Sequence, residues 1–168
     1  MPFADPSVRQ SLDAIRRIVQ ALRLTAREAE KRVGLSAAQL FVLQKLGEAG
    51  HLTINDLAAR THTHQSSVSV VVQRLARHKL ITRRRSKNDR RVVEAALTPT
   101  GRALLKRAPQ AAQERLVLAL QALPLGDRKR LAALLTRVVR QTGLSSERPE
   151  LFFEPPQAKG TSKRHARN

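Results

Sequence analysis

Apolar residues recur at helical spacing near the start of the chain, at Leu12, Ile15, Val19 and Leu22. They follow Asp5 and Pro6, a pairing of an N-cap residue with a proline at the first helical position. The pattern predicts a first helix that runs to about Arg32 and ends at Gly34, because glycine suits the position just after a helix.

Two capping-box sequences predict the next two helices. Ser36–Gln39 opens a second helix, whose end we place at Gly47 and Gly50. Thr53–Asp56 then opens a short third helix that closes near Arg60.

A fourth helix is predicted over residues 64–78, after a short turn. Its apolar residues form one stripe at Val68, Val71, Val72 and Leu75. The other side, with its flanks, is small, polar and free of acidic residues: Gln65, Ser66, Ser69, Val70, Gln73, Arg74 and Arg77. A helix that faces only water usually mixes acidic and basic residues, so this surface suggests a contact with another molecule.

After this helix, apolar residues recur about every 2 residues instead of every 3.6. This spacing predicts strands over 80–83 and 91–97 joined by a turn at 86–88. Thr98 and Pro99 cap a long helix that reaches Leu120 and is kinked at Pro109. A turn over 123–126 precedes a last helix ending at Gly143. The predicted fold is therefore mainly α with a small β-hairpin.

We expect four regions within one compact domain. They are an N-terminal dimerisation helix (5–34), a winged helix-turn-helix region (35–98), C-terminal dimerisation helices (99–144) and a basic, proline-containing tail (145–168). The first and last helices carry more apolar surface than a winged unit needs for its own core, which favours a homodimer. Phe152 and Phe153 in the tail are expected to dock on the helices.

The charge balance narrows the choice of partner. The 168 residues include 32 Lys and Arg but only 13 Asp and Glu, giving a net charge of +19. Such a field attracts polyanions, and the realistic candidates are nucleic acid, in particular double-stranded DNA, or an anionic membrane surface. With no cysteine, disulfides and thiolate metal sites are excluded. No apolar run approaches a membrane span, so we expect a cytoplasmic protein without a membrane partner.

Three helices followed by a hairpin predict a winged helix-turn-helix. The slim fourth helix can enter a major groove and place side chains against base edges. The hairpin tip can then meet the neighbouring DNA backbone through Arg84, Arg85, Lys87, Arg90 and Arg91. Asp89 cannot bind phosphate, and we expect it to orient Arg91, which lies two residues further on the same strand face.

Several short motifs resemble the multiple-antibiotic-resistance regulator (MarR) family of bacterial repressors. They are Leu35-Ser36, Leu57-Ala58-Ala59-Arg60, Ser66-Ser67-Val68-Ser69 with Leu75, and Asp89-x-Arg91 followed by Leu97-Thr98 and Gly101-Arg102. The resemblance spans about residues 10 to 142. It implies a homodimer on a pseudo-palindromic operator, and a small aromatic or anionic effector bound between domains. No other cofactor is implied.

Three positions depart from the family pattern. His64 stands where an N-cap serine or aspartate is common, which weakens the predicted cap unless Thr63 substitutes for it. Lys79 stands where glycine is usual before the first strand, so a different turn is expected there. Val70 replaces a polar or basic residue, so its contact with DNA would be apolar, for example to a thymine methyl group.

Other interpretations compete with a specific regulator. The charge alone would suit a non-specific nucleic-acid or nucleoid-associated protein, and Asp89 with Arg91 could form an ordinary surface ion pair. His62 and His64 could be two metal ligands of a metal-dependent enzyme. The sequence shows no third ligand at a suitable spacing, no nucleophile–base pair and no phosphate-binding glycine loop. We therefore expect neither a metal site nor an enzyme.

Overall fold

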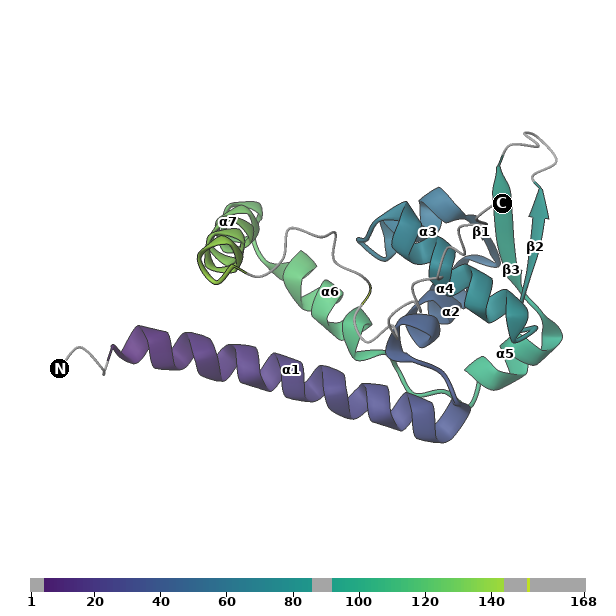
Figure 1. Cartoon of the computed structure of the whole chain (residues 1–168), viewed down its shortest axis with the longest axis horizontal. Helices are drawn as coiled ribbons and strands as arrows, with labels where there is room; N and C mark the ends of the chain where they lie inside the picture. Colours follow the sequence, from purple (N-terminus) through teal and green to yellow (C-terminus); the bar gives the residue numbers. More distant parts are fainter. Residues whose placement is uncertain (1–4, 86–91, 144–150, 152–168) are drawn as a thin grey trace, which may run out of the picture.

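The computed structural model describes residues 5–85, 92–143 and 151. In chain order the elements of this part are α1 (Pro6–Val33), α2 (Ala37–Ala49), β1 (His51–Thr53), α3 (Ile54–Arg60), α4 (Gln65–Arg77), β2 (Ile81–Arg85), β3 (Val93–Leu97), α5 (Pro99–Leu105), α6 (Ala112–Ala122) and α7 (Leu125–Gln141). The prediction of a mainly helical fold with a small antiparallel sheet is confirmed (Figure 1).

Hydrogen bonds confirm the predicted starts of the first three helices. Asp5 caps α1 by accepting from the Ser7 backbone N–H at 2.8 Å, and Gly34 ends the helix with a left-handed φ of 67°. Reciprocal capping boxes open α2 at Ser36 and α3 at Thr53. Gly47, however, lies inside α2 rather than at its end, and only Gly50 terminates that helix.

The core is built around α2, which is surrounded by α1, α3, α4, α5, α6 and the sheet. Its residues Leu40 to Leu43 and Leu46 are completely buried. The predicted apolar stripe of α4 packs into the same core, and Val68, Val71, Val72 and Leu75 are each no more than 1% exposed. The packing of α4 against α2 and α3 fixes which face the helix presents outward.

The sheet has three strands in the order β1-β3-β2, all antiparallel. The prediction of a two-stranded hairpin was incomplete, because β1 is only three residues long and too short to show an alternating pattern. It pairs with β3 through His51 opposite Ala96. The hairpin pair itself is present, with β2 extending two residues beyond the predicted end.

The prediction of one long kinked helix across Pro109 is wrong. The structure has two helices, α5 and α6, because Pro109 lacks an N–H and disfavours a helical conformation at the residue before it. The Gln44 side chain bonds to the break, donating to the Pro109 carbonyl at 2.9 Å and accepting from the Ala111 N–H at 3.2 Å.

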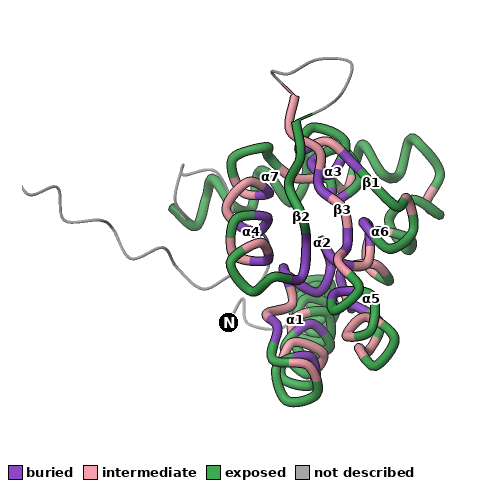
Figure 2. The backbone as a smooth tube through the Cα atoms, turned by 90° about the vertical axis from the view of Figure 1, so that its right-hand side faces the viewer, coloured by how far each residue is buried: buried purple, intermediate pink, exposed green. Residues whose placement is uncertain are grey.

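The helices α1, α6 and α7 extend away from the winged unit (Figure 1). The last of them begins at Leu125, earlier than predicted, and none of its residues is buried. Figure 2 shows the exposed residues in green. Large apolar residues on all three helices are among the exposed ones: Val8, Leu12, Ile15, Ile18, Leu24, Leu118, Leu120, Leu125, Leu134, Leu135, Val138 and Val139.

Candidate nucleic-acid interface

The outer face of α4 has the polar composition predicted from the sequence. Gln65, Ser66 and Gln73 are exposed, whereas Ser69, Val70 and Arg74 are half-buried beside them. No acidic residue occurs in the helix. The rigid attachment of its opposite face to the core holds these six side chains in a fixed register, which direct reading of base edges requires.

The N-cap position of α4 is His64, where the sequence predicted a weakened cap. His64 has extended backbone geometry, but its side chain makes no capping hydrogen bond. The preceding turn is held by the backbone, with the Thr63 N–H donating to the Ala58 carbonyl at 3.0 Å. The first amide groups of α4 therefore receive no hydrogen bond from the N-cap side chain.

The strand β2 follows α4 directly and packs against it. Its three arginines, Arg83, Arg84 and Arg85, are all exposed. The register places Arg84 opposite Glu94 and Arg85 opposite Val93. Because strand side chains alternate, Arg83 and Arg85 share one sheet face and Arg84 lies on the other.

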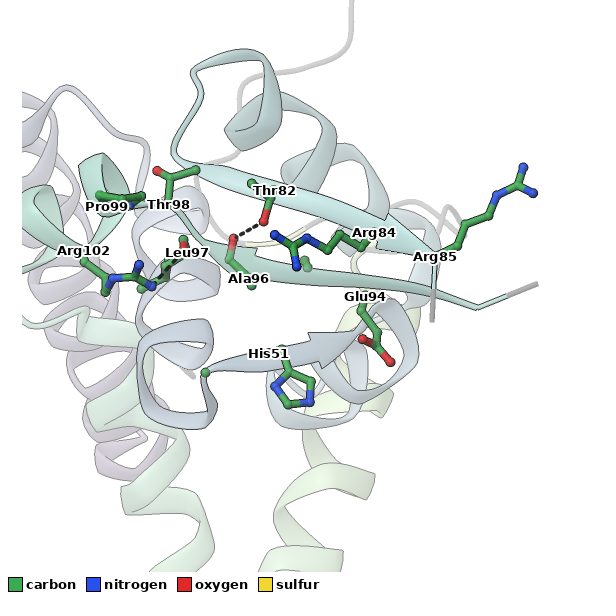
Figure 3. Close-up of a pocket in the computed structure, with 12 residues that line it drawn as sticks. His51, Thr82, Arg84, Arg85, Glu94, Ala96, Leu97, Thr98, Pro99 and Arg102 are labelled. Atoms are coloured by element: carbon green, nitrogen blue, oxygen red, sulfur yellow. Dashed lines mark hydrogen bonds between the residues drawn. The ribbon is translucent and has the colours of Figure 1, made fainter. Parts of the chain in front are cut away.

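The sheet face that carries Arg84 is hollowed, with a cavity of about 770 Å³ (Figure 3). The Arg84 side chain runs along this face toward Thr82 and Ala96, whereas Arg85 points away at the end of the strand. Arg102 closes the other end and donates to the Leu97 carbonyl at 2.9 Å. Arg84 is thus directed along the sheet, and Arg85 away from it.

The turn between α4 and β2 has a strained residue. Lys79, which stands where glycine is usual in the family pattern, adopts a positive φ of 57°. Its carbonyl accepts a hydrogen bond from the Thr98 hydroxyl at 2.9 Å. The left-handed conformation is thus formed even without glycine, and Thr98 ties the turn to the start of α5.

Part of the predicted wing lies outside the described residues: the turn 86–88, with Lys87, and the residues Asp89, Arg90 and Arg91. The expected orientation of Arg91 by Asp89 therefore stays a prediction, as does docking of Phe152 and Phe153. In contrast, Arg83 was missed as a candidate from the sequence. The alternation of side chains along a strand could have identified Arg83, because residues 83 and 85 lie on the same sheet face.

Three helices and a β-hairpin flanked by long helices define a winged helix-turn-helix protein. A family model described as the MarR family matches residues 35–93, from two residues before α2 to the start of β3. The chain belongs to this family. Its members are transcriptional regulators, in agreement with the expectation that the chain is not an enzyme.

Individual relatives extend the similarity beyond the winged unit. The HTH-type transcriptional repressor MdtR of Bacillus subtilis is 31% identical over 101 residues, a match that spans 60% of this chain and 65% of MdtR. A solved probable transcriptional regulator from Pseudomonas aeruginosa is 32% identical, with a TM-score of 0.53 over 78% of this chain and 98% of that one.

A third similar protein is Bordetella bronchiseptica BpsR, whose DNA binding is regulated by 6-hydroxynicotinic acid. It is 28% identical, with a TM-score of 0.52 over 77% of this chain and 98% of BpsR.

Neither a membrane span nor a metal cluster is found in the part of the chain that the structure describes. No helix there has both the length and the apolar character to cross a bilayer. No three His, Asp or Glu side chains gather there in a metal-binding group, and His62 instead contacts Gln121 through its Nε2 atom at 3.2 Å.

Proposed function

We propose that the chain is a sequence-specific DNA-binding repressor that acts in the cytoplasm as a homodimer on a pseudo-palindromic operator and is released by a small molecule. The observation that carries the proposal is the position of the acid-free face of α4 directly beside a strand with three exposed arginines. A polar reading surface next to a cationic strand matches the base edges and phosphates of one duplex.

Gln65, Ser66, Ser69, Val70, Gln73 and Arg74 contact base edges in this arrangement. Arg84, Arg85, Lys87, Arg90 and Arg91 meet the backbone or the minor groove, with Asp89 orienting Arg91. The half-buried Val70 provides an apolar contact that suits a thymine methyl group. The net charge of +19 adds the long-range attraction that brings the protein to DNA.

The dimer is supported by the apolar surface that one chain leaves uncovered. Leu134, Leu135 and Val138 of α7 are each between 46% and 49% exposed. Leu12 and Ile15 of α1 are exposed to a similar extent. Apolar residues on both terminal arms can be covered by a second copy, which also supplies the second recognition helix for a two-fold operator.

Release by a small molecule is supported by BpsR, whose DNA binding responds to 6-hydroxynicotinic acid. In this chain a small aromatic or anionic effector between the winged unit and the helical arms would change the separation of the two recognition helices. That separation must match about one turn of DNA, so a small change lowers affinity.

The test is binding of the full chain to a duplex selected from a random-sequence library and to a scrambled version, each at two salt concentrations. We expect tight binding to the selected duplex and weak binding to the scrambled one. Equal binding to both, lost together as salt rises, would identify the chain as a non-specific nucleic-acid protein and overturn the proposal.

A further inference from the structure

Two neighbouring residues of α2 connect the winged unit to α6. The first is Gln44, which bonds to both sides of the break before α6. The second is Lys45, which is only 8% exposed although it carries a charge. Since α6 leads from this junction into α7, both contacts lie where the winged unit meets its helical arms (Figure 1).

Lys45 forms a largely buried ion pair across this junction. Its ammonium nitrogen lies 2.5 Å from Oε2 of Glu114 in the first turn of α6, and the two side chains are 10% and 15% exposed. The same nitrogen reaches Glu48 of α2 at 3.2 Å and lies 5.7 Å from the centre of the Phe41 ring. Contacts with an aromatic ring and two carboxylates leave the ammonium group little freedom.

Burial acts to lower the pKa of Lys45, but its hydrogen bonds with Glu114 and Glu48 outweigh this effect and raise the pKa. The group therefore stays charged at neutral pH. Buried ion pairs contribute little net stability compared with apolar pairs of similar size, but they demand a particular geometry. Simple core packing would be served as well by an apolar residue at each position.

We propose that Lys45 and Glu114 are positioning residues that set the direction in which α6 leaves the winged unit. In the dimer this direction determines the spacing and tilt of the two recognition helices. The inference rests on the proposed function, because it concerns binding to a two-fold operator by two copies of the chain. Gln44 holds the junction together, and the ion pair selects one orientation of it.

The central variant is Lys45→Met combined with Glu114→Gln, which removes both charges and leaves no unpaired buried ion. It is compared with a charge-exchanged variant, Lys45→Glu with Glu114→Lys, in which Glu48→Gln also removes the carboxylate that would repel the new one at position 45. The affinity of each variant is measured for two duplexes. The two-site duplex is the one selected from a random library by the unmodified protein, and the one-site duplex is a copy in which one half-site is scrambled. The neutral variant should lose about tenfold or more on the two-site duplex and keep its affinity for the one-site duplex.

A second measurement reports the geometry directly. The chain has no cysteine, so Asn55→Cys on the exposed surface of α3 accepts a single spin label. Pulsed electron resonance then measures the distance between the two labels of a dimer. We expect one narrow distribution for the otherwise unmodified protein, a broader or shifted one for the neutral variant, and recovery in the charge-exchanged variant.

An unchanged distance distribution with unchanged two-site binding would overturn the positioning role. Equal losses on the one-site and two-site duplexes would also overturn it, because they would indicate a general role in folding. If the unmodified protein binds both duplexes equally, the proposed dimeric recognition itself fails, which is a different result.

Discussion

Gly101 of α5 lies directly against the backbone carbonyl of Leu80, the residue that precedes β2. A Cβ atom at position 101 would overlap the Leu80 carbonyl oxygen, and the Leu80 N–H donates back to Leu75 of α4 at 3.0 Å. The Thr98 hydroxyl accepts from the Gly101 N–H at 3.0 Å and donates toward Leu80. These contacts connect the end of α4, the start of β2 and α5.

Replacing Gly101 with alanine should destabilise the fold by about 1–3 kcal/mol or more, because the atom in the way belongs to the backbone and cannot rotate aside. Urea denaturation followed by circular dichroism measures the change. Gly126→Ala is the matched control, since a Cβ there meets nothing and the residue lies in α7. The control should be neutral or more stable by up to about 1 kcal/mol. Equal effects at both positions would contradict the packing argument.

Lys79→Gly should stabilise the protein by about 0.5–1 kcal/mol. Lys79 has a φ of 57°, which costs an L-residue about 1–2 kcal/mol, and glycine relieves most of this cost despite its greater freedom in the unfolded chain. Lys79→Ala removes the charge but keeps the strain, so it should not be stabilising. Both variants can be compared by urea denaturation, and a gain in Lys79→Ala as large as that in Lys79→Gly would point to charge repulsion instead.

Two variants should distinguish side chains that contact bases from side chains that contact phosphates. Gln73→Ala should reduce the discrimination between selected and scrambled duplexes by about 1–3 kcal/mol. Arg85→Gln should weaken binding to both alike and lower the salt slope by about one.

Arg84→Gln removes the same charge from the hollowed sheet face, opposite Glu94, and should change the slope less. Fluorescence anisotropy at several salt concentrations distinguishes these outcomes. Equal salt slopes for the Arg84 and Arg85 variants would show that DNA binding does not depend on which sheet face carries the arginine.

The short helix α3 should weaken in acid through Asp56. Hydrogen bonds from the Thr53 hydroxyl and backbone lower the pKa of this carboxyl below its usual 3.8. The lowered pKa means that the ionised form stabilises the fold above about pH 4, and that this contribution is lost as pH falls through the folded-state pKa. The stability difference between the unmodified chain and Asp56→Asn, followed by urea denaturation, should shrink below that pH. A difference independent of pH would contradict the role of the charge.

The sequence predicted well what local rules control, and less well what depends on distant partners. Caps at Asp5, Ser36 and Thr53 and the buried stripe of α4 follow from residue types at fixed spacing. The strand β1 depends on pairing with β3, more than forty positions later. The break at Pro109 follows from local rules, but the Gln44 side chain that bonds to both sides of it lies on another helix and could not be predicted.

The candidate site shows the same division. The polar residues of α4 were identified from periodicity, because their helix face is set by the buried stripe. The different directions of Arg84 and Arg85 depend on the register of β2 with β3, which the charge run does not reveal. The connection of Lys45 to Glu114 was also hidden, because a lysine among leucines in α2 shows no sign of its partner in α6.

The apolar surface of α7 provides the sharpest test of the dimer. Leu135 is 46% exposed, and Leu134 and Val138 beside it are similarly exposed. If a second copy covers them, Leu135→Glu would bury an unpaired charge and should raise the dimer dissociation constant by about a hundredfold or more. Lys129→Glu places a carboxylate on the opposite side of the same helix and should leave assembly unchanged. Analytical ultracentrifugation over a range of concentrations measures both. A dimer that tolerates Leu135→Glu as well as Lys129→Glu would mean that α7 faces solvent in the assembly and that the two copies meet elsewhere.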